Sequence, residues 1–471
     1  MRSYDILVIG SGPGGEKAAV QAAKFGKKVA VIERSPFIGG AGIHTGTLPS
    51  KTLREAAIFI SGLKQRAVFG HYFLPGRDVT LGELMYKKSE VIRRQMEVII
   101  DHFGRNNIEV VYGEASFVDA HTLAVRRGGG ESERLRGEII VIATGTRPAR
   151  PPEVPFDSTH IYDSDTILEL DRLPASIAVV GGGVIGCEYA CIFASLGVKV
   201  TLIDKRERLL GFVDAELVTS LLYWMRHMGI TVRGGEQVTG ITVEGKGRVV
   251  TRLASGKIVV TEKLLYTMGR VGNTDRLNLE AVGLEADDRG LLKVDSAYRT
   301  AVPNIYAVGD VIGFPSLAST SREQGRIAVC HAVEDHGEAC ALPSLLPYGI
   351  YTIPEISMVG ETEQTLTEKG VPYESGTALF QEVARGQIIG DVHGMLKLLF
   401  HRETLRLLGV HIVGERASEL IHIGQAVMSF GGTVEYFRDV VFNYPTLSDA
   451  YKQAALNGLN RLGGKPCHDE G

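Results

Sequence analysis

One stretch near the start of the chain decides the fold: YDILVIGSGPGG, residues 4–15. Its apolar first half, Tyr4–Ile9, is typical of a buried parallel strand. The turn that follows fits G-x-G-x-x-G, and the pattern then predicts a helix over 14–25 and a strand over 28–32 that ends at Glu33. A strand, a glycine-rich turn, a helix and a second strand in this order predict a dinucleotide-binding unit.

Each glycine of this turn has its own physical role. Gly10 permits a tight turn, Gly12 lets the backbone approach a pyrophosphate, and Gly15 lets the helix pack closely on the strand. The helix N-terminus offers free N–H groups to phosphates. Glu33 follows Gly10 by 23 residues, where a carboxylate can accept hydrogen bonds from a ribose.

The same unit occurs a second time. We expect a strand over 176–180, a helix over 184–196 and a strand over 199–203, around the turn GGGVIG at 181–186. Asp204 closes this copy, again 23 residues after the first glycine. A lone glycine-rich turn is weak evidence, but two matched copies predict an α/β protein with two Rossmann-like dinucleotide-binding domains.

Composition limits the remaining classes of protein. A chain of 471 residues favours two to four domains. The net charge of −4 indicates neither a nucleic-acid partner nor a membrane partner. No apolar run approaches the ~20 residues that span a bilayer. The first strand begins at Tyr4, too early for a signal peptide, so we expect a cytoplasmic protein.

The five cysteines are scattered and odd in number, which does not indicate a disulfide framework. Cys187 and Cys191 are four residues apart on an expected helix, where we predict two reduced, packed thiols. No cluster has the spacing of a structural zinc site, so no metal site is predicted.

A second stretch, GGAGIHTGTLPSK at residues 39–51, resembles the active-site segment of the flavin-dependent disulfide reductases, such as dihydrolipoamide dehydrogenase. Gly42 and Thr47 stand where that family has its two redox-active cysteines. A thiolate is the nucleophile of thiol–disulfide exchange, and neither residue can replace it. The resemblance therefore implies the scaffold of a disulfide reductase without disulfide reduction by that dithiol.

The resemblance also divides the nucleotides: FAD in the first unit, NAD(H) or NADP(H) in the second. Residues 140–148, 266–273 and 300–310 resemble other segments of the same superfamily. The residues so assigned to FAD are Gly10, Gly12, Pro13, Gly14, Gly15, Glu33, Arg34, Gly40, Thr47, Lys51, Thr144, Gly145, Gly309 and Asp310. Those assigned to NAD(P) are Gly181, Gly183, Ile185, Gly186, Asp204, Lys205, Arg206 and Gly269. The alternative for Asp310 is a simple turn or N-cap residue.

The expected domains follow from this division. The FAD-binding domain takes 1–150 and, after the NAD(P)-binding domain at 151–272, a second segment at 273–345. The remainder, 346–471, resembles the α+β dimerisation domain of the family and implies a homodimer or larger homo-oligomer. In it we expect strands over 351–359, 394–400 and 405–413 and helices over 419–430 and 447–459.

Lys51 and Glu188 occupy the positions at which the family forms an ion pair beside the flavin N5. A positive charge there would stabilise reduced flavin and help to set its potential. We therefore predict both as catalytic residues. The alternative is an ordinary solvated surface pair.

A third segment also departs from the disulfide reductases. Tyr444 and Asp449 stand where they place a histidine base and an acid from the partner subunit. A tyrosine, with a reference pKa of about 10, is a poor base at neutral pH. The thiols and their base are thus missing together, which favours a different reaction. The alternative role for Tyr444 is simple packing.

The resemblance is closest to the soluble, flavin-dependent pyridine nucleotide transhydrogenases, over about residues 4–462, with IYDSD at 161–165, GIYTIPEIS at 349–357 and FNYPT at 442–446 among its specific stretches. It implies hydride exchange between NADPH and NAD⁺ through FAD. Asp204 would favour NAD, since a carboxylate repels the 2′-phosphate of NADP. Lys205 and Arg206 could offset that repulsion, or both could be solvated.

Two other functions remain open at this point. A diaphorase would pass electrons from the flavin to a quinone, O₂ or another small acceptor, and the same sequence would serve it. A non-catalytic flavoprotein is disfavoured, because it has no need of the second nucleotide unit.

Overall fold

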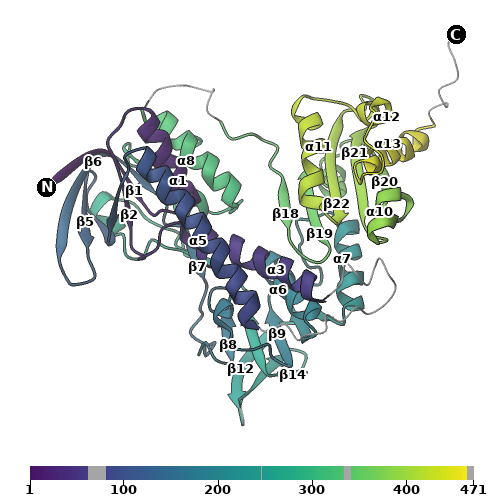
Figure 1. The fold of residues 1–471 in the computed structure, drawn as a ribbon, viewed down its shortest axis with the longest axis horizontal. Coiled ribbons are helices and arrows are strands. Elements are labelled where there is room, and N and C mark those ends of the chain that lie inside the picture. Colours follow the sequence, from purple (N-terminus) through teal and green to yellow (C-terminus); the bar gives the residue numbers. More distant parts are fainter. Residues whose placement is uncertain (62–80, 246, 334–340, 464–471) are drawn as a thin grey trace.

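The computed structural model describes residues 1–61, 81–245, 247–333 and 341–463 (Figure 1). Its described part contains three main sheets, and each lies in a different region of the chain. Cys340 and Cys467 lie outside the described residues. Cys187 and Cys191 are free and buried, as predicted. None of the described helices has the length and apolarity that a bilayer crossing demands.

The first sheet is built around the N-terminal unit. Its seven strands are β1 (Arg2–Ile9), β2 (Val29–Glu33), β3 (Glu109–Tyr112), β4 (Glu114–Asp119), β5 (Thr122–Arg126), β6 (Ser132–Ile142) and β17 (Ile305–Ala307). The order is β3-β2-β1-β6-β5-β4, and β17 pairs with β6 in parallel. The chain therefore returns to its first sheet after the second nucleotide unit, as the sequence predicts.

Helices cover this sheet and lead away from it. The glycine-rich turn feeds α1 (Pro13–Lys24), which lies beside α8 (Ala318–Val333) (Figure 1). The short α2 (Gly40–His44) and the longer α3 (Thr47–Ser61) follow β2. The long α5 (Leu81–Arg105) packs along α3.

The second sheet repeats the first arrangement. Its five strands are β8 (Ile161–Asp163), β9 (Ser176–Val180), β10 (Lys199–Ile203), β11 (Thr231–Arg233) and β15 (Lys263–Tyr266), in the order β11-β10-β9-β15-β8. α6 (Val184–Ser195) joins β9 to β10, and α7 (Ala215–His227) precedes β11. A separate three-stranded sheet holds β12 (Val238–Glu244), β13 (Arg248–Leu253) and β14 (Ile258–Thr261).

Two short strands join the regions of the first two sheets. β7 (Thr146–Pro148) pairs antiparallel with β16 (Arg270–Gly272), so the outgoing and returning chains lie side by side. The division of the chain at residues 150, 272 and 345 stays a prediction.

The third sheet belongs to the C-terminal region. Its strands are β18 (Tyr348–Ile350), β19 (Glu355–Gly360), β20 (Tyr373–Leu379), β21 (Met395–His401) and β22 (Leu407–Gly414), and all neighbours are antiparallel. The helices of this region are α9 (Glu363–Glu368), α10 (Ala384–Ile389), α11 (Ala417–Ser429), α12 (Glu435–Asp439) and α13 (Asp449–Arg461). β21 and β22 and both long helices match the expected elements within two residues.

The expected strand over 351–359 is wrong in its first four residues, because β19 begins only at Glu355. The chain leaves the sheet after Ile350 and enters it again at Glu355. Between them the Tyr351 N–H and the Thr352 carbonyl bond to side chains instead of a strand. Pro354 has no N–H to give to a ladder. This interruption places Tyr351 beside the functional residues described below.

Candidate functional site

A cavity of about 1050 Å³ lies where the three regions meet. The first glycine-rich turn, the α2–α3 segment, the start of α6 and the turn after β18 all contribute to its wall. The predicted FAD residues that line it are Gly10, Gly12, Pro13, Gly14, Glu33, Arg34, Gly40, Thr47, Lys51, Thr144, Gly145, Gly309 and Asp310. From the second unit, Gly183, Ile185, Glu188 and Gly269 also line it.

Six predicted residues do not line this cavity: Gly15, Gly181, Gly186, Asp204, Lys205 and Arg206. Gly15 and Gly186 act by packing. A Cβ on Gly15 would stand 1.9 Å from the Gly10 carbonyl oxygen, and one on Gly186 would stand 1.8 Å from that of Gly181. Real side chains cannot approach so closely, so both positions require glycine.

Gly10, Gly12 and Gly40 form a cradle, a part of the cavity wall where backbone segments approach too closely for side chains. A Cβ on Gly40 would lie 2.8 Å from the Gly12 Cα, and one on Gly10 would lie 2.5 Å from the Ala143 carbonyl oxygen. Gly10 also has φ +102°, in the region that favours glycine. The cradle, the helix N-terminus of α1 and the cavity volume fit a dinucleotide such as FAD.

Glu33 at the end of β2 is held by a small set of neutral donors. Its Oε2 accepts hydrogen bonds from Ser11 N at 3.0 Å and Ser11 Oγ at 2.6 Å, and its Oε1 accepts from Ser35 N at 2.8 Å. The Ser11 hydroxyl in turn accepts from Gly39 N at 2.8 Å. This network ties the first nucleotide turn to the start of the α2–α3 segment.

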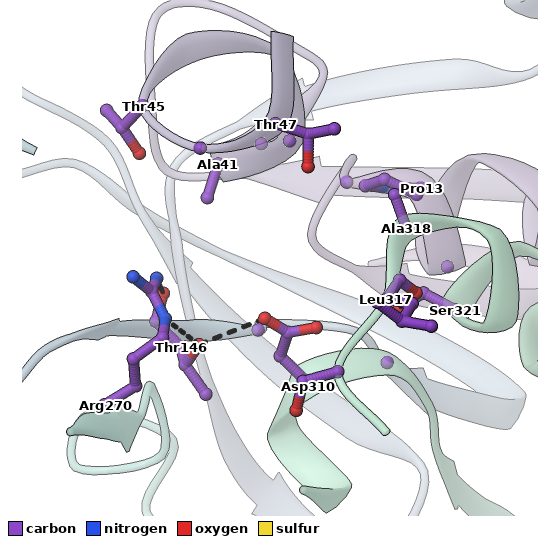
Figure 2. Close-up of a pocket in the computed structure, with 18 of the residues that line it drawn as sticks. Pro13, Ala41, Thr45, Thr47, Thr146, Arg270, Asp310, Leu317, Ala318 and Ser321 are labelled. Carbon is purple, nitrogen blue, oxygen red and sulfur yellow. Dashed lines mark hydrogen bonds between the residues drawn. The ribbon is translucent and has the colours of Figure 1, made fainter. Parts of the chain in front are cut away.

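Asp310 also lines the cavity, beside Thr146 of β7 and Arg270 of β16 (Figure 2). Its Oδ2 accepts a hydrogen bond from Thr146 Oγ1 at 3.2 Å, and that hydroxyl accepts one from Arg270 Nε at 2.8 Å. Gly309 N donates to Gln324 Oε1 at 2.8 Å, which fixes the turn before Asp310. A carboxylate thus lines the cavity from the turn that follows β17, where the sequence predicts it.

The two vacated thiol positions also lie on the cavity wall. Gly42 is in α2, Thr47 begins α3, and both line the cavity. Among the described residues, Cys187, Cys191 and Cys330 are buried and none of them lines it. Burial raises the pKa of the Cys191 thiol to about 12, which keeps it protonated. The described chain therefore brings no reactive thiol to this cavity.

Lys51 and Glu188 form an ion pair on the cavity wall, with 2.6 Å between Lys51 Nζ and Glu188 Oε2. The Glu188 side chain is 5% exposed and that of Lys51 25%. Glu188 Oε1 accepts a hydrogen bond from Tyr351 N at 2.9 Å, and Lys51 Nζ lies 5.0 Å from the centre of the Tyr351 ring. The pair is therefore fixed from both sides and is not a solvated surface pair.

Asp204 directly follows β10, does not line the cavity and pairs with Arg206. Its Oδ1 accepts from Arg206 N and Nε at 2.8 and 2.9 Å, and its Oδ2 accepts from Arg206 Nη2 at 2.9 Å and from Gly182 N. Burial opposes the charge, but the hydrogen bonds from Arg206 and Gly182 outweigh it and lower the pKa of Asp204. The expectation that Arg206 could be merely solvated is thus wrong, whereas Lys205 is exposed.

Comparison with known proteins gives a consistent result. Residues 4–325 match the model of the pyridine nucleotide-disulphide oxidoreductases, and residues 346–455 match the dimerisation domain of the same family. The soluble pyridine nucleotide transhydrogenase of Mycobacterium tuberculosis is 50% identical over 98% of both chains, and that of Erwinia tasmaniensis is 51% identical over the same shares. The chain belongs to the soluble pyridine nucleotide transhydrogenases of this family.

Solved structures of the family share the fold. LpdA from M. tuberculosis has a TM-score of 0.88 at 27% identity and covers 97% of this chain and 99% of its own. The HOCl-induced flavoprotein disulfide reductase RclA from Escherichia coli has a TM-score of 0.86 at 28% identity, with coverage of 96% and 99%. The predicted fold class, two dinucleotide-binding domains with a dimerisation domain, is therefore confirmed.

Tyr444 lies in the part of the chain that matches this dimerisation domain. It is 75% exposed and does not line the cavity. Asp449 accepts a hydrogen bond from Gln453 Nε2 at 3.0 Å within α13. In one chain, then, neither residue reaches the cavity, which is consistent with positions that would act on a partner in a homodimer.

Sequence reasoning missed several residues of the cavity wall, namely Asp165, Tyr189, Arg270, Tyr348, Tyr351, Ser418 and His422. The stretches IYDSD and GIYTIPEIS contain two of them, Asp165 and Tyr351, and were the available signal. Burial raises the pKa of Asp165 and of Tyr351, so each proton is held more tightly than usual. The remaining residues belong to elements that only the folded chain brings to the cavity.

Proposed function

We propose that the protein is an FAD-dependent transhydrogenase that moves hydride reversibly between NADPH and NAD⁺. The observation that carries this proposal is the Lys51–Glu188 pair on a cavity whose two vacated thiol positions are Gly42 and Thr47. The printed names of relatives that are half identical over nearly the whole chain support the same activity.

Bound FAD would accept the hydride of one nicotinamide nucleotide and return it to another. The cradle of Gly10, Gly12 and Gly40 would take the pyrophosphate, Glu33 the adenosine ribose, and Asp310 the ribityl–phosphate region. Residues 1–150 and 273–345 would form the FAD-binding domain, and residues 151–272 the domain for the nicotinamide nucleotide. Gly183, Ile185 and Gly269, which line the cavity, would meet that second nucleotide, and Gly181 and Gly186 would shape the turn that receives it.

Lys51 supplies the positive charge of the site. Its ammonium is one-quarter exposed and paired with a buried carboxylate, so its charge acts in a region of low dielectric. The Tyr351 N–H donates a hydrogen bond to Glu188 Oε1, and Glu188 Oε2 pairs with Lys51. The pair would thus hold a fixed cation at the place where hydride arrives and departs.

Use of both NAD and NADP would depend on Arg206. Both oxygens of Asp204 are occupied by Arg206 and Gly182, so a ribose hydroxyl must displace the guanidinium to bind there. A 2′-phosphate would draw the same guanidinium away from Asp204 and pair with it bidentately. Arg206, 52% exposed, would therefore serve either nucleotide by changing its partner.

The assembly would be a homodimer formed through residues 346–455, which match the dimerisation domain of the family. Larger homo-oligomers and a cytoplasmic location are further parts of the proposal. Tyr444, exposed in one chain, would lie near the cavity of the partner.

The decisive experiment is double-mixing stopped flow on the purified yellow protein. NADPH reduces the flavin in the first mix, and NAD⁺ is added in the second. The proposal expects the oxidised flavin absorbance to return at a rate equal to or above steady-state turnover. A return with O₂ or a quinone but not with NAD⁺ would establish the diaphorase instead, and reduction of lipoamide would contradict the reading of Gly42 and Thr47.

A further inference from the structure

The C-terminal sheet contacts the segment of the second unit that follows β10 and carries Asp204 and Arg206. Residues 204–214, the reading segment, run from Asp204 at the end of β10 to Asp214, the N-cap of α7. Leu209, Leu210 and Val213 pack into the core beneath it. The second half of the segment, however, contacts elements that follow residue 345.

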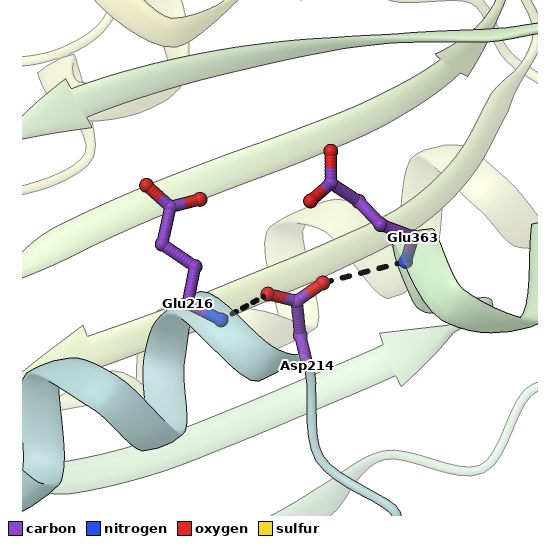
Figure 3. A group of neighbouring side chains, drawn as sticks. All are labelled: Asp214, Glu216 and Glu363. Carbon is purple, nitrogen blue, oxygen red and sulfur yellow. Dashed lines mark hydrogen bonds between the residues drawn. The ribbon is translucent and has the colours of Figure 1, made fainter.

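Four charged side chains make the strongest of these contacts. Figure 3 shows the carboxylates of Asp214, Glu216 and Glu363, which converge from α7 and α9. Lys397 Nζ, from β21, lies 3.0 Å from Asp214 Oδ1, 2.9 Å from Glu216 Oε2 and 2.8 Å from Glu363 Oε2. The spacing of the three carboxylates would suit a cation, and the ammonium of Lys397 takes that role.

Burial makes this contact rigid. The side chains of Asp214 and Lys397 are 0% and 1% exposed, so neither charge can turn to water. Burial disfavours the ammonium, but hydrogen bonds to Glu363, Glu216 and Asp214 outweigh it and raise the pKa of Lys397. A buried charge without its partner is strongly unfavourable, so the two side chains hold each other in place.

Asp214 also links backbone to backbone. Its Oδ1 accepts from Glu216 N at 3.1 Å, which caps α7, and its Oδ2 accepts from Glu363 N at 3.3 Å, at the start of α9. Two residues earlier, Phe212 packs edge-on against Tyr348, with 5.0 Å between ring centres. Tyr348 lines the cavity. The reading segment is thus attached to the C-terminal region at two points.

We propose that Lys397 and Asp214 form a clamp by which the C-terminal sheet positions the reading segment and thereby sets the discrimination between NAD and NADP. The clamp rests on the proposed function for the assignment of nicotinamide nucleotides to this unit. Lys397 touches no nucleotide and is a positioning residue. It acts by keeping Asp204 and Arg206 where a ribose meets them.

The test variant is Asp214→Asn/Lys397→Met, which removes both fully buried charges together. Glu216 and Glu363 lose their cation, but their side chains are 51% and 30% exposed, so water can solvate them. Asn retains a good N-cap for α7, and Met retains the length of the lysine chain. The control is Leu398→Ala, the next residue of the same strand. Leu398 is fully buried in a core cluster that contains no residue of the reading segment.

Dissociation constants of NAD⁺ and NADP⁺ are measured by titration of the FAD-loaded dimer, with flavin absorbance and melting temperature recorded for each protein. We expect the double variant to bind both nucleotides about five- to tenfold more weakly and with a NAD⁺/NADP⁺ ratio closer to one, because a preorganised segment has become mobile. Its flavin spectrum should be unchanged. Leu398→Ala should lower the melting temperature and leave both constants as in the native protein.

Two results would overturn the clamp: constants within twofold of the native values in the double variant, or an equal change in Leu398→Ala. Because binding is measured without turnover, the result does not depend on hydride transfer. A native protein that binds both nucleotides but fails to pass hydride to NAD⁺ would refute the proposed function. The clamp would still be tested by the dissociation constants of the double variant.

Discussion

The two glycine-rich units share their backbone geometry and differ in how they hold their terminal acid. Gly10 and Gly181 have φ +102° and +112°, and Gly15 and Gly186 leave the same lack of space for a Cβ. Glu33 and Asp204 each accept from two backbone N–H groups, but the third partner of Glu33 is a serine hydroxyl, whereas that of Asp204 is the guanidinium of Arg206.

This difference matches the two kinds of occupant that we propose. Two of the three donors to Glu33 belong to Ser11, which is fully buried in the turn, so the first unit suits a cofactor that stays bound. The guanidinium of Arg206 is half exposed and can leave Asp204 when a nucleotide arrives. Turns of the same backbone geometry thus suit phosphate groups in both units. The side chain that holds the terminal acid distinguishes the unit for a permanently bound nucleotide from the unit for an exchangeable one.

The largest effect should come from filling either turn. Gly15→Ala should abolish FAD retention, and Gly186→Ala should lower kcat/KM for nicotinamide nucleotides more than about a hundredfold while FAD stays bound, because each new Cβ meets a rigid carbonyl oxygen. Flavin absorbance and steady-state kinetics measure the two. Gly104→Ala, on open helix surface, is the control. Loss of FAD in both variants would contradict the assignment of FAD to the first unit and of the nicotinamide nucleotide to the second.

Lys51→Met should come next. Loss of the fixed cation should slow flavin reduction by NADPH about a hundredfold in single-turnover stopped flow and lower the flavin potential measured by dye titration. Lys369→Met, which breaks an exposed pair with Glu361, should change neither. A native rate with an unchanged potential would show that the ion pair is structural only.

The acid of the second unit can be tested directly. Asp204→Ala should weaken NAD more than NADP, and Arg206→Ala should do the reverse, each by about tenfold in kcat/KM, since each variant removes one charged hydrogen-bond partner. Arg252→Ala, from an exposed pair in the β12–β14 sheet, is the control. Ratios unmoved by both variants would place nucleotide discrimination elsewhere.

The smallest effect should come from making the first unit resemble the second. Ser11→Gly removes the hydroxyl between Glu33 and Gly39 N and should cost about 1–2 kcal/mol of unfolding free energy in urea, because a buried N–H loses its acceptor. FAD should also dissociate faster. Thr251→Val deletes a buried hydroxyl that has no partner and should not destabilise. An equal loss of unfolding free energy in Ser11→Gly and Thr251→Val would show that the Ser11 hydroxyl does not stabilise the turn.

Sequence reasoning succeeded where the signal is local. β9 and β10 have the bounds that the pattern predicts, and α1 and α6 lie within one residue of theirs. It failed at residues 351–354, where bonds to Glu188 and Arg54 replace a strand ladder. A local pattern has no information on such partners, because they lie more than 160 residues away in the chain.

The candidate site shows the same limit. Lys51 and Glu188 could be paired only through a family resemblance, since 137 residues separate them. Arg206 was expected to assist NADP, but its bidentate bond to Asp204 was not foreseen. Lys397 lies in the middle of an apolar strand, and the sequence did not predict that it would contact three carboxylates.

By itself, the sequence determined the two nucleotide units, their terminal acids and the absence of the dithiol, because glycine spacing, strand periodicity and residue identity are properties of short segments. Only the tertiary structure decided which charges meet: Lys51 with Glu188, Asp204 with Arg206, and Lys397 with Asp214. Such pairs depend on burial and on distances of a few ångströms between elements, and these exist only once the three sheets have packed together.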